Sequence, residues 1–245
     1  MNKTFTRLFF CLIVLIATNS ATLGQSLETK LSQKLRTYDS DKSTTLEQLT
    51  EVAQRFQLPA GIEWVDKPNQ QAAKPVHLRN LTLREVISAI VNEEDGYRFA
   101  TVDGVLQVYA LSIAEDPRNF LNIKLPIYAA KNRSLSEISY WLRVRIKMAL
   151  HPERNFGGGF GGKSAQDDFN TPTITFSVTD ANVRTILNRI VVAQGNSLWI
   201  VHINPGLLMK GEPFYAQAVS PDTENSSSDF AWAFIPLSTT NGISH

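Results

Sequence analysis

The stretch VHLRNLTLREVI, residues 76–87, decides the fold of this chain, because its pattern returns a second time. Its apolar residues first alternate and then recur at helical spacing, which predicts a strand that runs directly into a helix. The same pattern is found in ITFSVTDANVRTIL, residues 174–187, where Arg184 takes the place of Arg84. Repetition of one packing unit, with no catalytic cluster in either copy, is typical of a binding scaffold.

Capping residues indicate where the helices begin. Thr82 and Ser134 each start a capping box that a glutamate three residues later completes, and Thr44 or Thr45 starts an earlier helix. An Asp-Gly pair at 103–104 indicates a two-residue hairpin. The sequence predicts strands over 35–38, 62–65, 76–78, 97–102, 105–109, 120–129, 173–178 and 197–203, and helices over 46–56, 82–95, 182–193 and from 135 onward.

These elements group into two tandem small α+β modules, each expected to have the order strand, helix, strand, strand, helix, hairpin. The first module spans residues 35–112 and the second spans residues 118–207. A flexible lead, 25–34, precedes them, and a C-terminal tail, 208–245, follows them.

The second module is the longer of the two. From Leu46 to Leu83 is 37 positions, whereas from Leu135 to Val183 is 48, a difference of 11 residues. A glycine-rich tract, 155–168, lies in this interval. We interpret it as an insertion in a connecting loop, where added length has a small entropic cost.

Part of this tract, GGGFGGKS at 157–164, matches the phosphate-loop pattern, with Lys163 as the lysine. That pattern binds phosphate only between a buried strand and a helix that opens directly after the lysine. The residues on either side have neither character, and Pro172 follows soon after. The tract is therefore interpreted as a glycine loop, and no nucleotide or other cofactor is expected.

Residues 1–24 have the pattern of a signal peptide, with Lys3 and Arg7 before an apolar run at 8–17 and small residues after it. The run is shorter than the roughly 20 apolar residues that span a bilayer, so we expect cleavage and export, with an uncleaved anchor as the alternative. Cleavage removes Cys11, the only cysteine, which excludes a disulfide-stapled fold. With 24 basic and 23 acidic residues the chain carries no charge signature for nucleic acid.

The segment Val76-x-Leu78-x-Asn80-Leu81-Thr82-Leu83-Arg84-Glu85-Val86-Ile87, followed by Gly96-Tyr97-x-Phe99 and Asp103-Gly104-Val105-Leu106-x-Val108, resembles a known module. It is similar to the secretin and TonB short N-terminal (STN) domain of outer-membrane secretins and TonB-dependent receptors. The resemblance covers 35–110 well and 120–205 more loosely. It implies a small α+β sandwich used for protein–protein contact in the bacterial envelope. No secretin pore region or receptor barrel is expected after the modules, so fold and periplasmic setting are what carry over.

Catalytic and metal sites are not expected. The four histidines have no ligand partners at metal-site spacing, and no nucleophile elbow is present. Asp167 and Asp168, beside the glycine loop, leave a hydrolase as an alternative, which would require a pocket that shifts a carboxylate pKa.

Aromatic residues suggest where a partner would bind. Phe156, Phe160 and Trp141 either line a groove for a peptide or glycan or fill the core. The alternating segment 230–234 either folds back on its own second module or adds a strand to a partner. The predicted interaction surface consists of Phe156, Phe160, Lys163, Asp167, Asp168, Phe230, Trp232 and Phe234.

The sequence therefore predicts an exported, periplasmic or outer-membrane-associated protein that is not an enzyme and binds another protein of the envelope. The alternatives are the hydrolase and a periplasmic glycan-binding module, which would show a row of aromatic side chains on one sheet surface.

Overall fold

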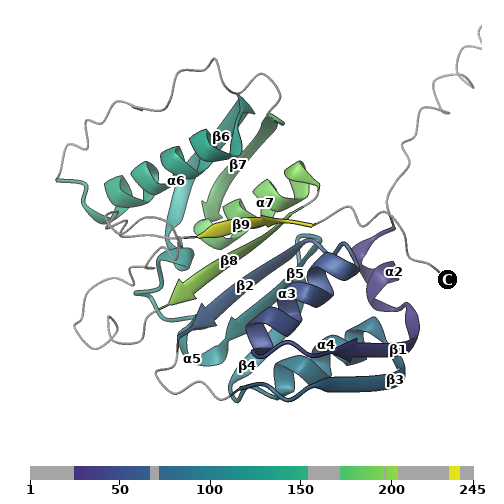
Figure 1. Ribbon diagram of the computed structural model, residues 1–245. Coiled ribbons are helices and arrows are strands. Elements are labelled where there is room, and N and C mark those ends of the chain that lie inside the picture. Colours follow the sequence, from purple (N-terminus) through teal and green to yellow (C-terminus); the bar gives the residue numbers. More distant parts are fainter. Residues whose placement is uncertain (1–24, 67–71, 154–171, 196, 204–231, 238–245) are drawn as a thin grey trace, which may run out of the picture.

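The computed structural model describes residues 25–66, 72–153, 172–195, 197–203 and 232–237 and confirms the α+β class (Figure 1). Residues 1–24, the whole glycine-rich tract 155–168 and most of the tail lie outside these ranges. In chain order the elements are α2 (Leu27–Leu31), β1 (Lys34–Ser40), α3 (Thr45–Arg55), β2 (Ala60–Val65), β3 (Val76–Thr82), α4 (Leu83–Asn92), β4 (Tyr97–Val102), β5 (Val105–Ala110), α5 (Leu111–Ala114), η1 (Phe120–Asn122), β6 (Lys124–Arg133), α6 (Leu135–Leu150), β7 (Ile174–Asn182), α7 (Val183–Gln194), β8 (Ser197–Ile203) and β9 (Ala233–Pro236).

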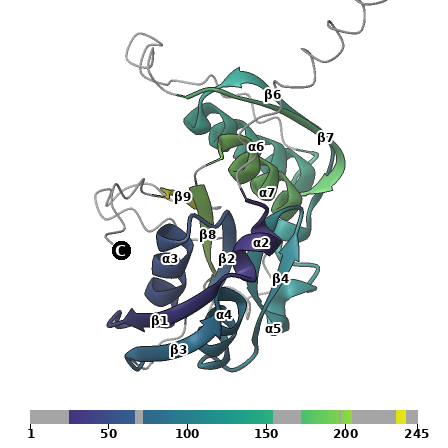
Figure 2. The same ribbon diagram turned by 90° about the vertical axis from the view of Figure 1, so that its right-hand side faces the viewer.

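The described strands form three sheets. Antiparallel pairs β1–β3 and β6–β7 lie at opposite ends of the molecule, and a five-stranded sheet in the order β4-β5-β2-β8-β9 lies between them (Figure 2). Helix α4 contacts β1 and β3 on one side and β4 on the other, and α7 likewise contacts β6 and β7 on one side and β8 and β2 on the other. Each repeat thus packs a helix between a two-stranded sheet and the central sheet.

The opening strands of the two repeats correspond residue by residue. Both β1 and β6 begin with Lys-Leu-x-x-Tyr, and their first seven residues alternate between buried and exposed in the same order. The residue that follows the helix cap makes the same backbone hydrogen bond in both copies. Leu83 donates its N–H to the carbonyl of Gln33 at 2.9 Å, and Val183 donates to Ile123 at 3.1 Å. Residues in β1 and α3 therefore correspond to β6 and α6 at a shift of 90 positions.

The junctions between strand and helix also recur. Asn80, Asn132 and Asp180 each lie two residues before a helix cap, with φ of 56°, 51° and 46°. Asn and Asp adopt this left-handed conformation more readily than other residues with a Cβ. The turn lets β3, β6 and β7 pass directly into a helix.

Side-chain capping confirms the predicted helix starts and corrects the length comparison. Thr44, Thr82 and Ser134 each form a complete capping box, so Thr44 and not Thr45 begins the early helix. From Thr44 to Thr82 is 38 positions, and from Ser134 to Asn182 is 48. The second repeat is longer by 10 residues and not 11, because Leu135 corresponds to Thr45 and not to Leu46.

The second repeat departs from the expected order of elements. Residues 150–153, which correspond to the start of β2, end helix α6 and form a turn, so the described part of this repeat has no counterpart of β2. Strand β8 instead pairs in parallel with β2 of the first repeat, from Ala60 opposite Leu198 to Val65 opposite Ile203. The expected strand 120–129 begins only at 124, because Phe120–Asn122 form a buried 3₁₀ turn capped by Asn119.

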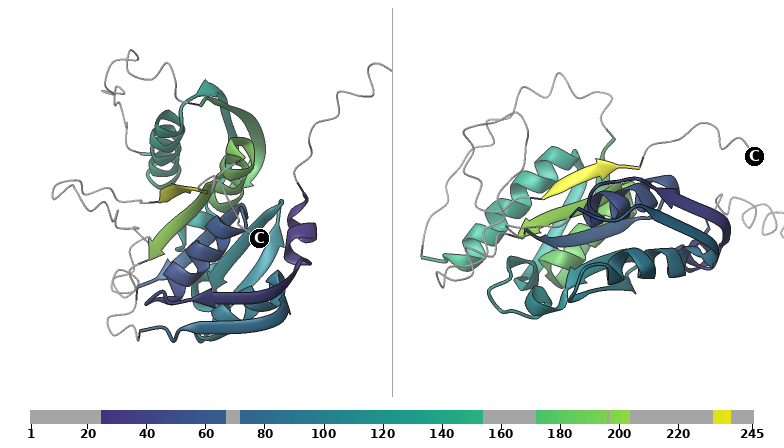
Figure 3. Two further views of the ribbon diagram at one scale, coloured as in Figure 1. Left: turned by 45° about the vertical axis from the view of Figure 1, so that its right-hand side comes forward. Right: turned by 60° about the horizontal axis from the view of Figure 1, so that its bottom comes forward.

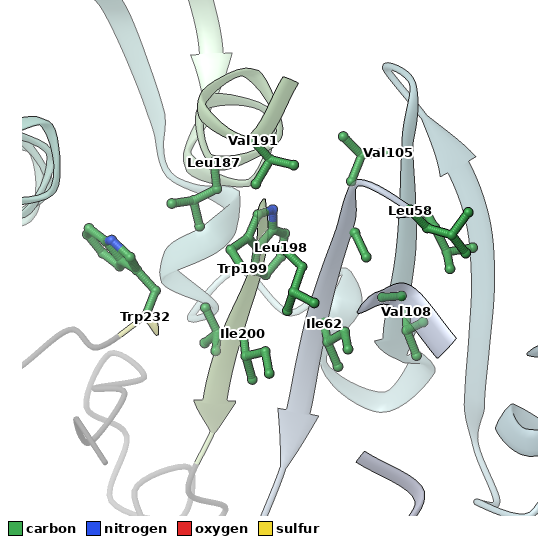
Figure 4. Close-up of a cluster of buried hydrophobic side chains, with 14 of the residues drawn as sticks. Leu58, Ile62, Val105, Val108, Leu187, Val191, Leu198, Trp199, Ile200 and Trp232 are labelled. Carbon is green, nitrogen blue, oxygen red and sulfur yellow. The ribbon is translucent and has the colours of Figure 1, made fainter. Parts of the chain in front are cut away.

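The contact between the repeats depends on a glycine beneath a tryptophan. Gly61 lies opposite Trp199 in the β2–β8 register, and a Cβ on Gly61 would come within 2.3 Å of the indole Cε2, in the space that the indole occupies. The indole is fully buried, beside Leu187 and Val191 of α7 (Figure 4), and its Nε1 donates to the Asn188 side chain at 2.9 Å. A side chain at position 61 would displace Trp199.

We expect Gly61→Ala to lower the free energy of unfolding by about 1–3 kcal/mol, because overpacking forces the indole or the strand to move. Denaturant unfolding of the single and double variants measures this. The same substitution made in a Trp199→Leu background should cost less, since the clashing atoms are gone. An equal cost in both backgrounds would show that the indole is not the constraint.

Candidate interaction surface

Six of the eight predicted surface residues lie outside the described part of the chain: Phe156, Phe160, Lys163, Asp167, Asp168 and Phe230. The other two, Trp232 and Phe234, belong to the β9 segment. Strand β9 pairs antiparallel with β8, so the expectation that this segment folds back on its own second repeat is confirmed (Figure 3).

Trp232 is a buried anchor rather than an exposed contact. It is 7% exposed, its ring stacks 6.3 Å from that of Phe120, and the Arg143 guanidinium lies 5.0 Å above it. Its Nε1 lies 3.4 Å from Ser139 Oγ on α6. Burial lowers the pKa of Arg143, although the tryptophan ring offers this cation a favourable face. The segment ties α6 to the central sheet.

The opposite side of α6 is exposed and apolar. Trp141 is 42% exposed and Met148 44% exposed on the same helical face, and Ile127 of the neighbouring β6 is 58% exposed. Filling of the core by Trp141 is therefore excluded. Trp141 is also the only large aromatic side chain in the exposed class within the described residues. This part of the chain shows no row of exposed aromatics of the kind expected for glycan binding.

A cleft of about 300 Å³ lies between β6 and α6. Ile127, Ala129 and Arg133 line it from the strand, and Ile138, Trp141 and Arg145 line it from the helix. We call this site the second-repeat cleft. Tyr128 also lines it, but its hydroxyl donates to the Ile138 carbonyl at 2.6 Å, and burial raises the pKa of this tyrosine while the nearby Arg145 charge opposes that shift.

The cleft lies in a strongly basic segment. Residues 124–150 carry six basic side chains and one acidic one, whereas the equivalent residues 34–60 carry four of each. The single acid, Glu137, caps α6 and pairs with Arg133 at 2.9 Å. Among the described residues, Arg145 has no carboxylate within ion-pair distance, and its side chain is exposed. The cleft thus combines the apolar side chains of Ile127 and Trp141 with a guanidinium that has no carboxylate partner among the described residues.

The first repeat shows what the same fold looks like without this surface. At the shift of 90 positions Ile127 corresponds to Thr37, and Trp141 corresponds to Glu51. Glu51 accepts a hydrogen bond from Ser40, 2.5 Å away, within its own repeat. The apolar anchors of the cleft are therefore not required by the fold.

A second groove, of about 720 Å³, runs along β7 and α7 in the same repeat. Residues Phe176–Asn182 form its strand wall, and Arg189 and Val192 lie on its helix wall. No other described strand pairs with this edge of β7.

One polar cluster in the described chain has the composition of a catalytic site, and it is buried. Glu63 on β2 is fully inaccessible and forms a bidentate pair with Arg184 of α7, at 2.5 and 2.9 Å. Gln107 and Asn119 donate to the same carboxylate at 3.1 and 3.5 Å, and Arg184 also binds Asn122 at 2.7 Å. Because both oxygens of Glu63 are used and no face is open, the cluster is structural: it fastens α7 of the second repeat to β2 of the first.

Two histidines, His77 and His202, each contact a carboxylate. His77 is 73% exposed, as expected for an outward strand position, and contacts Asp39 at 2.9 Å; His202 is more enclosed and contacts Asp66 at 3.0 Å. Within the described ranges, no three His, Cys, Asp or Glu side chains converge in a way that could hold a metal ion. Nor does any helix there have the length and apolarity to cross a membrane.

Comparison of the chain with known protein families, with curated proteins and with solved structures gave no match. The candidate surface is therefore described from the residues and geometry of this chain alone. Sequence reasoning found Trp141 but missed Ile127 and Arg145. The available signal was Ile127 itself, an apolar residue next to the buried Tyr128 and hence on the opposite face of its strand.

We expect Arg184→Met to lower the free energy of unfolding by about 3–5 kcal/mol, because it leaves the Glu63 carboxylate buried without a counter-ion. Arg84→Met is the matched control at the equivalent position. Its pair with Glu28, at 2.6 Å, joins side chains that are 44% and 59% exposed, so its loss should cost under about 1 kcal/mol. Chemical denaturation of the two variants compares them directly, and equal losses would contradict the structural role of the buried pair.

Proposed function

We propose that this protein is an exported, non-enzymatic component of the cell envelope whose two fused STN-like repeats bind another protein through the second-repeat cleft. The observation that carries the proposal is that Ile127 and Trp141, two exposed apolar side chains, line the cleft together with Arg145, while Met148, also exposed, lies two turns further along the same face of α6. The first repeat has polar residues at the matched positions of Ile127 and Trp141. The exposed apolar character of Ile127 and Trp141 is therefore not required by the fold.

The composition of the cleft favours a protein partner. Tryptophan and arginine are enriched in protein interfaces and carry a large share of the binding energy when a partner excludes water from them. Grouped exposed apolar side chains on a soluble domain often mark an interaction site. Pairing with β7 holds the strand wall of the cleft in place, and the contacts of Trp232 with Ser139 and Arg143 hold the helix wall, which lowers the entropy that binding must overcome.

The envelope setting rests on two features of the sequence: the signal-peptide pattern at 1–24 and the STN resemblance of the first repeat. The rival functions lack a supporting observation. Asp167 and Asp168, which a hydrolase would use, lie outside the described residues. Among the residues that the structure describes, Trp141 is the one large aromatic side chain that is exposed, whereas a glycan site would need several.

Site-specific photo-crosslinking in cells that produce the protein tests the proposal. A photoreactive amino acid at Ala129, on the strand wall of the cleft, should capture one defined envelope protein. The same amino acid at Asp39, the matched position of the first repeat, is the control and should not capture it.

The double substitution Ile127→Thr and Trp141→Glu installs the residues that the first repeat carries at these positions. We expect this variant to keep its melting temperature within a few degrees, because both sites are exposed, and to lose the captured protein. Equal capture at positions 129 and 39, or capture that survives the double substitution, would contradict the proposed site.

A further inference from the structure

We infer that the occupant of the second-repeat cleft is an acidic linear segment of a partner protein, which places an apolar side chain against Trp141 and a carboxylate against Arg145. This inference rests on the proposed function and specifies the chemistry of the partner.

The charge of the segment that forms the cleft favours an acidic partner. The segment that builds both walls of the cleft has a net charge of +5, from six basic residues and one acid, while its counterpart in the first repeat has a net charge of zero. The one acidic side chain of this segment, Glu137, already has partners, because it accepts hydrogen bonds from Ser134 and pairs with Arg133. Two of the six basic residues, Arg133 and Arg145, line the cleft itself, whereas Arg143 lies against Trp232 and Lys124 lies 3.9 Å from Asp180. The described lining of the cleft contains no carboxylate, so it attracts an acidic partner and repels a basic one.

The guanidinium of Arg145 favours a carboxylate ligand. Arg145 lines the cleft and, within the described chain, has no carboxylate in ion-pair range. A guanidinium presents paired N–H donors that match the two oxygens of a carboxylate, so an Asp or Glu side chain is its natural counterpart. In the first repeat, by contrast, Glu51 stands where Trp141 stands here, and its negative charge would repel such a ligand.

The size and lining of the second-repeat cleft favour a short segment over a folded domain. About 300 Å³ is at the lower limit of ligand pockets, so the cleft holds a few side chains and not the face of a folded domain. Ile127 and Trp141 offer apolar area on opposite walls, which suits an aliphatic or aromatic side chain between them. Together these features select a short acidic segment with an embedded apolar residue.

Fluorescence anisotropy with defined peptides tests the inference on the full mature chain. The probe is a fluorescein-labelled peptide, Gly-Asp-Glu-Phe-Asp-Glu-Leu-Gly. One control peptide has lysine at every acidic position, and a second has alanine in place of Phe and Leu. We expect both controls to bind at least about tenfold more weakly than the probe, and the affinity of the probe to fall as NaCl is raised.

Protein variants then locate the site. Arg145→Gln should weaken binding of the probe about tenfold, because the charged hydrogen bonds to the carboxylate are lost. Arg55→Gln, the matched change in the first repeat, should leave binding unchanged. Circular dichroism confirms that both variants are folded.

Each contrary result has a distinct meaning. Equal binding of the lysine peptide, or no effect of Arg145→Gln, overturns the acidic partner. Equal binding of the alanine peptide shows a general anion surface and overturns the apolar contact. If the peptides fail while crosslinking at Ala129 still captures a protein, the proposed function stands and this inference falls; if the crosslink fails as well, both fall.

Discussion

The ion pair between Glu63 and Arg184 is the interaction on which the rest of the structure depends. Charges that are fully removed from water are tolerated only with a well-placed counter-ion and further hydrogen bonds, and this pair has both. Glu63 comes from β2 and Arg184 from α7, and the side chains that bind the pair come from β5 and from the segment between the repeats. Any other placement of α7 on the sheet would leave at least one charge unpaired, so the pair selects a single arrangement of the two repeats.

The two repeats therefore contain equivalent elements, but equivalent residues make different contacts. Arg84 and Arg184 occupy equivalent positions, yet the first forms a surface pair with Glu28 and the second reaches into the centre of the molecule. The difference follows from β2, which pairs with strands of both repeats. The first repeat contributes the shared strand, and the second contributes the exposed cleft. The proposed binding site thus lies in one of two equivalent repeats.

Much of the local structure could be predicted from the sequence, because its determinants are local. Capping boxes at Thr82 and Ser134, the Asp-Gly turn and the alternation of 230–234 all gave elements that the structure confirms. The shared sheet could not be predicted in the same way, since pairing of β2 with β8 is long-range. A signal was nevertheless present: AGIEWV and SLWIVHI are nearly continuous apolar runs, as expected for strands buried on both faces.

The position of β2 also bears on how the chain reaches its native state. Its two neighbours are far apart in the sequence: Ala60 lies opposite Leu106, 46 positions later, and opposite Leu198, 138 positions later. During synthesis, one edge of this apolar strand has its partner long before the other. Long-range parallel pairing is slow, and an open apolar edge invites pairing with other chains. Folding of the second repeat thus completes the first, and the interval before β8 arrives is when this protein is most exposed to aggregation and most in need of a chaperone.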